Sequence, residues 1–70
     1  MSVVKIIEII GSSEKGFDDA VRNVVEDVSR TVRNIDSVFI KGFKVHINDN
    51  KISSFGAICK VAFRVDEENK

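Results

Sequence analysis

The chain has 70 residues, 43% of them hydrophobic, and its 11 basic and 11 acidic side chains give a formal net charge of zero. Interspersed charges leave no basic patch for a nucleic acid or an anionic membrane. One cysteine excludes a disulfide within the chain, and one cysteine with one histidine does not give a zinc-type ligand spacing. We therefore expect a single domain over residues 1–70, whose small core favours association with further copies of the chain.

Residues 3–10 are rich in β-branched side chains and end at Gly11, which predicts a strand. Apolar side chains occupy both of its faces: Val4, Ile6 and Ile10 on one, Val3, Ile7 and Ile9 on the other. A strand with one solvent-exposed face would alternate, so we expect this one to be covered on both sides. Lys5 and Glu8 interrupt the segment, which argues against a signal peptide or membrane span and makes the cytoplasm the expected compartment.

An amphipathic helix is predicted to follow this strand. Ser12 or Ser13 is the expected N-cap, because its hydroxyl can accept from unpaired amides of the first turn, and Glu14 suits the positive end of a helix. One apolar stripe recurs at helical spacing: Phe17, Ala20, Val21, Val24, Val25, Val28, Val32 and Ile35. Charged and polar residues fill the opposite face, so the stripe is expected to cover a sheet.

Residues 37–47 are predicted to form the second strand. Its apolar positions change parity at Gly42, where we expect a bulge or a sharp bend. Residues 48–51, Asn-Asp-Asn-Lys, predict a turn, because Asn and Asp tolerate the left-handed backbone region. The third strand is expected over residues 52–65, with one apolar face at its odd positions, and residues 66–70 are expected to be an acidic, solvated tail.

These elements predict an α+β fold in the order β-α-β-β. A right-handed crossover through the helix makes the first two strands parallel to each other. The third strand returns through the turn at residues 48–51 and can fill the gap between them, giving a three-stranded antiparallel sheet of order 1-3-2. The helix covers one face of the sheet, while Ile58, Ala62 and part of the first strand remain on the other. Other copies of the chain are expected to cover that second face.

The chain resembles the dodecins, very small flavin-binding proteins that assemble as shells of twelve subunits. The resemblance rests on the Ile-Gly-Ser-Ser-Glu segment at residues 10–14, the Asn-Ile-Asp segment at residues 34–36 and the Val-Ala-Phe segment at residues 61–63, in this order and without insertions. It covers nearly the whole chain. It implies a β-α-β-β subunit, a homododecamer of cubic symmetry and ligand sites on the inner side of the shell.

The resemblance also indicates which residues line the ligand site. Flavin-binding dodecins have a tryptophan, which stacks on the flavin ring, at the position of Ser37, and a glutamine beside that ring at the position of Gly56. This chain contains no tryptophan. Losing such a stack is expected to cost roughly a hundredfold in affinity. Lys44 and Arg64 match positions where some dodecins carry arginines near a flavin phosphate or a nucleotide. Binding of a phosphate group is therefore expected to persist even without recognition of the flavin ring.

Other residues receive structural interpretations. Phe39 could in principle stack on a ligand, but its parity with Phe43 favours a packing role. His46 is interpreted as an ordinary surface histidine, and Cys59, which lies among apolar residues, as a buried and inert thiol. The Asn-Asp-Asn run at residues 48–50 lacks the spacing of a dedicated calcium loop and is interpreted as a turn. Copies of Glu8 or Asp49 could nevertheless surround an ion on a symmetry axis.

We therefore expect a non-enzymatic homododecamer that binds or stores a small ligand, because no set of nucleophile, base and orienting group is visible. The expected site residues are Ser37, Gly56, Lys44 and Arg64. The cofactor stays open: FMN or riboflavin is a candidate, with its site weakened. The alternative is a structural or calcium-type ion-binding dodecamer without flavin. Neither hypothesis includes a nucleic acid or a membrane as a partner.

Overall fold

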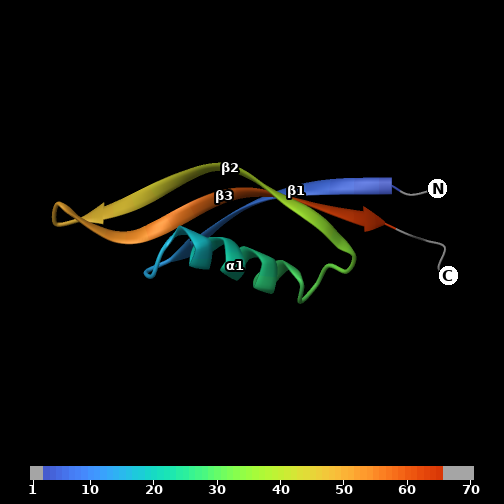
Figure 1. Cartoon of the computed structure of the whole chain (residues 1–70), viewed down its shortest axis with the longest axis horizontal. Helices are drawn as coiled ribbons and strands as arrows, with labels where there is room; N and C mark the ends of the chain where they lie inside the picture. The colour runs from blue at the N-terminus through green and yellow to red at the C-terminus, as the bar shows by residue number, and fades with distance from the viewer. Residues whose placement is uncertain (1–2, 66–70) are drawn as a thin grey trace.

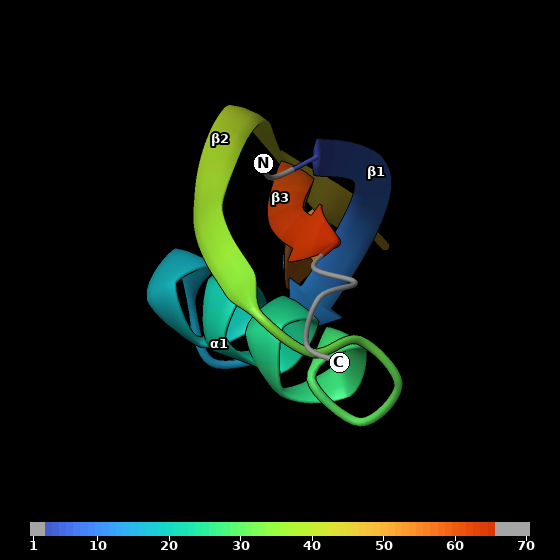
Figure 2. The same cartoon turned by 90° about the vertical axis from the view of Figure 1, so that its right-hand side faces the viewer.

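The computed structural model describes residues 3–65 and contains one helix and three strands. In chain order these are β1 (Val3–Ser13), α1 (Phe17–Val28), β2 (Ile35–Asn48) and β3 (Lys51–Val65). The three strands form one sheet, and α1 lies along one side of it (Figure 1). Seen from the end, all three strands lie to one side of the helix (Figure 2). The expected β-α-β-β order is confirmed, and the predicted tail at residues 66–70 lies outside the described residues.

The sheet has the predicted order β1-β3-β2, and both outer strands pair antiparallel with β3. β1 pairs with β3 without interruption from Val3 opposite Val65 to Ser13 opposite Phe55. The β2–β3 register shifts between Ile40 and Gly42, which confirms the predicted bulge, and it shifts again near either end of β2. The first two shifts insert Asp36 and Lys41 into β2 and so reverse the face to which the following β2 side chains point, whereas the third inserts Ser53 into β3.

The core lies between α1 and the middle of β3. Its fully buried residues are Ala20, Val24 and Val28 of the helix and Ala57, Cys59 and Val61 of β3. Half-buried residues of the outer strands, such as Ile7, Ile9, Val38 and Ile40, pack against this cluster. The predicted apolar face of β3 is therefore the face that the helix covers, and the hydrophobic effect holds the layers together.

The helix begins later than predicted, because β1 is longer than predicted. Ser12 and Ser13 pair with β3 as part of β1, and α1 starts at Phe17 after Gly16, with no side-chain cap. The Ser13 hydroxyl accepts from the Lys15 amide at 2.9 Å and donates to the Asp19 carboxylate at 2.7 Å. Ser13 therefore holds the connection between β1 and α1, and its predicted role as an N-cap is wrong, as is the placing of Glu14 inside the helix.

The helix also ends earlier than the apolar stripe suggested. α1 stops at Val28, and Ile35 already pairs with Phe63 as the first residue of β2. Asn34 has a φ of 62°, a left-handed conformation that ends the connection between the two elements. Val32 and Ile35 still pack against the core, so their spacing reflected burial and not helical backbone.

The β2–β3 hairpin extends as an arm beyond the end of β1, because Lys51, Ile52 and Ser54 of β3 pair only with β2 (Figure 1). Phe17, at the start of the helix, closes the core at the base of this arm. Its ring centroid lies 4.8 Å from that of Phe43 and 5.1 Å from that of Phe55. Such aromatic pairs are worth about 0.5–1.5 kcal/mol beyond their buried area.

The predicted turn at the tip of the arm is confirmed. Asn48 pairs with Lys51, and the two residues between them, Asp49 and Asn50, have φ values of 54° and 62°. Two consecutive left-handed residues form the tight connection whose backbone twist matches that of the flanking strands. Asn and Asp adopt this conformation more readily than other residues with a side chain.

Replacing Asn50 with valine is therefore expected to lower the free energy of unfolding by about 1–2 kcal/mol, because a β-branched residue is strained at positive φ. Asn50→Gly is the matched control and should be neutral or stabilising, since glycine adopts this conformation without strain. Guanidinium denaturation at one fixed protein concentration measures both. Equal midpoints for Asn50→Val and wild type would contradict the assigned turn.

Cys59 lies in the centre of the core and is 0% exposed, with a free thiol. Burial raises the pKa of this thiol, because the apolar surroundings disfavour the charged thiolate. The predicted burial of Cys59 is confirmed, and the raised pKa disfavours the thiolate, which is the nucleophilic form of cysteine.

Candidate functional site

The sheet face turned away from α1, here called the open face, contains all four predicted site residues. Opposed residues of antiparallel strands point to the same face, and side chains alternate along each strand. The open face therefore comprises Val4, Ile6, Glu8 and Ile10 of β1, Ser37, Phe39, Gly42, Lys44 and His46 of β2, and Gly56, Ile58, Lys60, Ala62 and Arg64 of β3. Large apolar side chains are exposed on it, including Ile6 at 61% and Phe39 at 65%.

The four residues fall into two pairs at opposite ends of this face. Ser37 lies opposite Ala62, one side-chain position from Arg64, whereas Lys44 lies opposite Gly56. Ala62 lies six positions after Gly56 in β3, which corresponds to about 20 Å along the strand. A single subunit therefore does not bring the four residues into one pocket. A site that uses both pairs needs residues from more than one copy of the chain.

The Lys44–Gly56 pair forms a basic surface at the base of the hairpin arm. Gly56 is buried although it lies on the open face. A Cβ atom at this position would lie 3.1 Å from Cγ and 3.5 Å from Cε of Lys44, and 3.6 Å from Nε2 of His46. The space above Gly56 is thus occupied by the lysine stem and the imidazole. Gly56 permits two basic side chains to converge.

The second pair lies where β3 ends. Ser37 and Arg64 are both exposed, and the Arg64 amide donates to the Asn34 carbonyl at 3.0 Å. Arg64 also lines a shallow surface depression together with Arg33 and Asn34. The small side chain of Ser37 leaves the open face free in front of it. This end of the sheet offers positive charge and space, and it lacks an aromatic ring at position 37.

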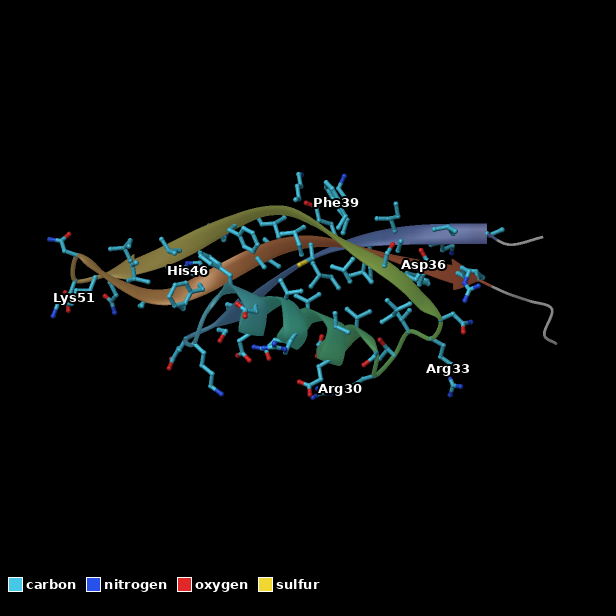
Figure 3. All side chains as sticks on the ribbon, in the orientation of Figure 1. Arg30, Arg33, Asp36, Phe39, His46 and Lys51 are labelled. Carbon is cyan, nitrogen blue, oxygen red and sulfur yellow. The ribbon has the colours of Figure 1, made fainter. Side chains whose placement is uncertain are left out.

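Phe39 corrects one prediction. It was expected to share a face with Phe43, but the bulge between Ile40 and Gly42 separates them. Phe43 packs against Phe17 on the helix side, whereas Phe39 stands on the open face, opposite Lys60. Figure 3 shows its ring pointing away from the helix. Phe39 is therefore an exposed ring two residues after Ser37, and its expected packing role within the subunit is wrong.

An ion pair crosses the middle of the open face. Nζ of Lys41, the extra residue at the bulge, lies 3.2 Å from a carboxylate oxygen of Glu8 on β1. Both side chains are about half exposed, so the pair contributes about 0–1 kcal/mol to stability in a single subunit. Within residues 3–65 no group of three or more His, Cys, Asp or Glu side chains is placed to hold a metal ion.

Fold and site together define a class of protein: a small β-α-β-β subunit with one covered and one open sheet face, the open face bearing basic and apolar side chains. A family model described as Dodecin matches residues 3–66, and the chain belongs to the dodecin family.

Relatives agree with this assignment. The dodecin of Thermus thermophilus is 26% identical over 65 residues, which cover 93% of this chain and 94% of that protein. The dodecin structure from Streptomyces davaonensis is 32% identical, with a TM-score of 0.89 over 94% of this chain and 97% of that one. A calcium-chelating dodecin from Mycobacterium tuberculosis shares the fold at 22% identity, with a TM-score of 0.82 over 94% of each chain.

Two features of the site were missed by the sequence interpretation. The exposure of Phe39 could have been inferred, because the parity change at Gly42 already separates it from Phe43. The approach of His46 to Gly56 had a weaker signal. Alternation within β2 places His46 beside Lys44, but only the β2–β3 pairing shows that both side chains lie over Gly56.

Proposed function

We propose that this dodecin forms a homododecameric shell that binds a small ligand of the flavin type, with ring recognition weakened relative to its flavin-binding relatives. The observation that supports it best is the open face. The face is apolar over much of its surface and basic at both ends, and no residue between 3 and 65 on the same chain covers it. Burial of this face against further copies would form ligand sites at the subunit contacts.

Within this proposal each of the four residues has a role. Ser37 replaces the stacking tryptophan, and Gly56 replaces the glutamine beside the ring, so both contacts with the ring system are lost. The Thermus thermophilus dodecin contains a tryptophan, since a structure of its tryptophan-to-phenylalanine variant is known, whereas this chain contains none. Lys44 and Arg64 would supply positive charge for a phosphate or carboxylate.

The proposed function is ligand binding and not catalysis. The proposed location of the protein is the cytoplasm. The buried free thiol of Cys59 is compatible with reducing surroundings. Within residues 3–65 no helix is long and apolar enough to cross a membrane.

Fluorescence quenching of FMN and riboflavin by the ligand-free protein tests the proposal, after light scattering has established the mass of the assembly. Weak quenching, at micromolar protein or above, is the expected result, because a lost stack costs roughly a hundredfold in affinity. Quenching at sub-micromolar protein would assign the stacking role to Phe39, the exposed ring nearest to Ser37. A monomer or dimer in light scattering, or no quenching at high micromolar protein, would contradict the proposed function.

The alternative is a structural shell with calcium-type ions on its axes. The Mycobacterium tuberculosis relative, which chelates calcium, favours this alternative, although 22% identity shows only a common fold. Of the two candidate ion ligands, Glu8 and Asp49, Glu8 forms an ion pair with Lys41. Asp49, at the hairpin tip, has no ion pair within residues 3–65. A melting temperature that rises with calcium, and not with FMN, would favour this alternative over the flavin-type shell.

A further inference from the structure

His46 and Lys44 together have the properties of an anion-binding pair. They occupy neighbouring positions on the open face of β2, and both side chains converge on Gly56. The imidazole Nε2 lies 3.6 Å, and the lysine Cε 3.5 Å, from the point where a Cβ of residue 56 would lie. Nζ is one bond further than Cε, about 1.5 Å. Nζ therefore lies within about 5 Å of the same point, so the ammonium group and the imidazole stand close together above Gly56.

No acidic side chain within residues 3–65 neutralises this pair. The ion pairs there join Arg30 to Asp27 and Lys41 to Glu8. Around His46, β2 contributes Lys44, while β3 contributes Ser54 directly opposite and Gly56 beside it. β1 contributes only Ser12, opposite Gly56, and α1 lies on the other face of the sheet.

Charge and geometry favour one class of ligand. Two nitrogen donors at neighbouring positions of one strand face suit a tetrahedral oxyanion, which offers several acceptor oxygens. Lysine is charged throughout the physiological range, whereas histidine changes its charge between pH 5 and 8. A second positive charge therefore faces the anion only when His46 is protonated.

We propose that His46 is the second anion-binding residue beside Lys44, and that its protonation strengthens retention of a phosphorylated ligand. The proposal deepens the proposed function, because it assigns the ligand's phosphate group to this end of the open face. Riboflavin lacks a phosphate and would not use the pair. FMN carries a phosphate monoester and would bind more tightly than riboflavin, by a factor that grows as the pH falls.

The test compares FMN with riboflavin at pH 8 and pH 5.5 by fluorescence quenching. For the assembled wild type, the ratio of the two affinities is expected to rise about three- to tenfold at the lower pH, as suits one added charge contact in a partly exposed site. The phosphate of FMN itself loses charge in this range, which acts in the opposite direction, so a rise must come from the protein. His46→Gln keeps a polar side chain of similar size that cannot be protonated, and it should abolish the rise.

Lys44→Gln serves as the matched variant. It should lower the preference for FMN at both pH values while retaining a dependence on pH. A wild-type ratio that is the same at both pH values would overturn the proposal, as would a His46→Gln ratio that still rises. Light scattering of each variant confirms that the assembly is intact.

Sulfate separates this inference from the proposed function, because it stays dianionic from pH 8 to pH 5.5 and has no ring. Sulfate should raise the melting temperature of wild type more than that of His46→Gln at pH 5.5, and equally at pH 8. If neither flavin binds but this sulfate difference appears, the proposed function fails and the anion pair stands. If riboflavin and FMN bind equally at both pH values and the sulfate difference is absent, the pair fails and the proposed function stands.

Discussion

Replacement of Ser37 by tryptophan is expected to strengthen riboflavin binding roughly a hundredfold, the largest effect on function that we predict. Ser37 lies exposed on the open face, in the bulged segment at the start of β2. An indole at this position would project into solvent in a single subunit and meet other copies only in the assembly. It would supply a stacking surface of about 1–3 kcal/mol per ring.

The measurement is the dissociation constant of riboflavin, taken from fluorescence quenching of wild type and Ser37→Trp. Ser29→Trp is the matched control, because Ser29 is exposed at the end of α1 and lies far from the open face in the fold. It adds the same indole without completing the site. Equal dissociation constants for the two tryptophan variants would contradict the assignment of position 37 to the ligand site.

Gly11→Ala is expected to destabilise the subunit by about 1–3 kcal/mol, the largest effect on stability that we predict for a single methyl group. β1 passes so close to α1 at this point that an added Cβ would lie 2.8 Å from the Ala20 carbonyl oxygen and would overlap the side chain of Val24. Val24 is buried and cannot turn aside into solvent, and a backbone oxygen moves only with the helix. The strand and the helix would have to separate.

Chemical denaturation at a fixed protein concentration measures this effect, because association contributes to the stability of a homo-oligomer. Gly16→Ala is the matched control. Gly16 has an extended φ of 165°, and a Cβ at this position would meet nothing within 4 Å. It should change the free energy of unfolding by no more than about 0.5 kcal/mol. If both variants lose equal stability, the close approach of β1 to α1 is not the cause.

Much of the fold could be predicted from local pattern. Apolar residues recur every second position in β3 and at helical spacing in α1, because one face of each element must leave water. The turn at Asp49 and Asn50 could also be predicted from local sequence, because few residues tolerate two consecutive left-handed conformations. The bulge near Gly42 was visible as a change of parity. Each of these features depends on neighbours within a few residues.

The element boundaries could not be predicted, because they depend on partners distant in the sequence. Ser12 and Ser13 have the local pattern of helix caps, yet they pair with Gly56 and Phe55 of β3 as part of the sheet. Ile35 continues the helical spacing, yet Phe63 of β3 pairs with it in β2. In both places hydrogen bonding to β3 overrides the local preference, since a strand needs a partner and a helix does not.

The candidate site shows the same division. The sequence by itself determined the order of the elements, the neutral charge, the absence of tryptophan and the resemblance that selects Ser37, Gly56, Lys44 and Arg64. Only the tertiary structure decided that these four residues share one face but form two pairs about 20 Å apart. It also placed Phe39 on that face and His46 beside Gly56. The physical reason is that strand register and the bulge set the direction of each side chain, and both depend on pairing across the sheet.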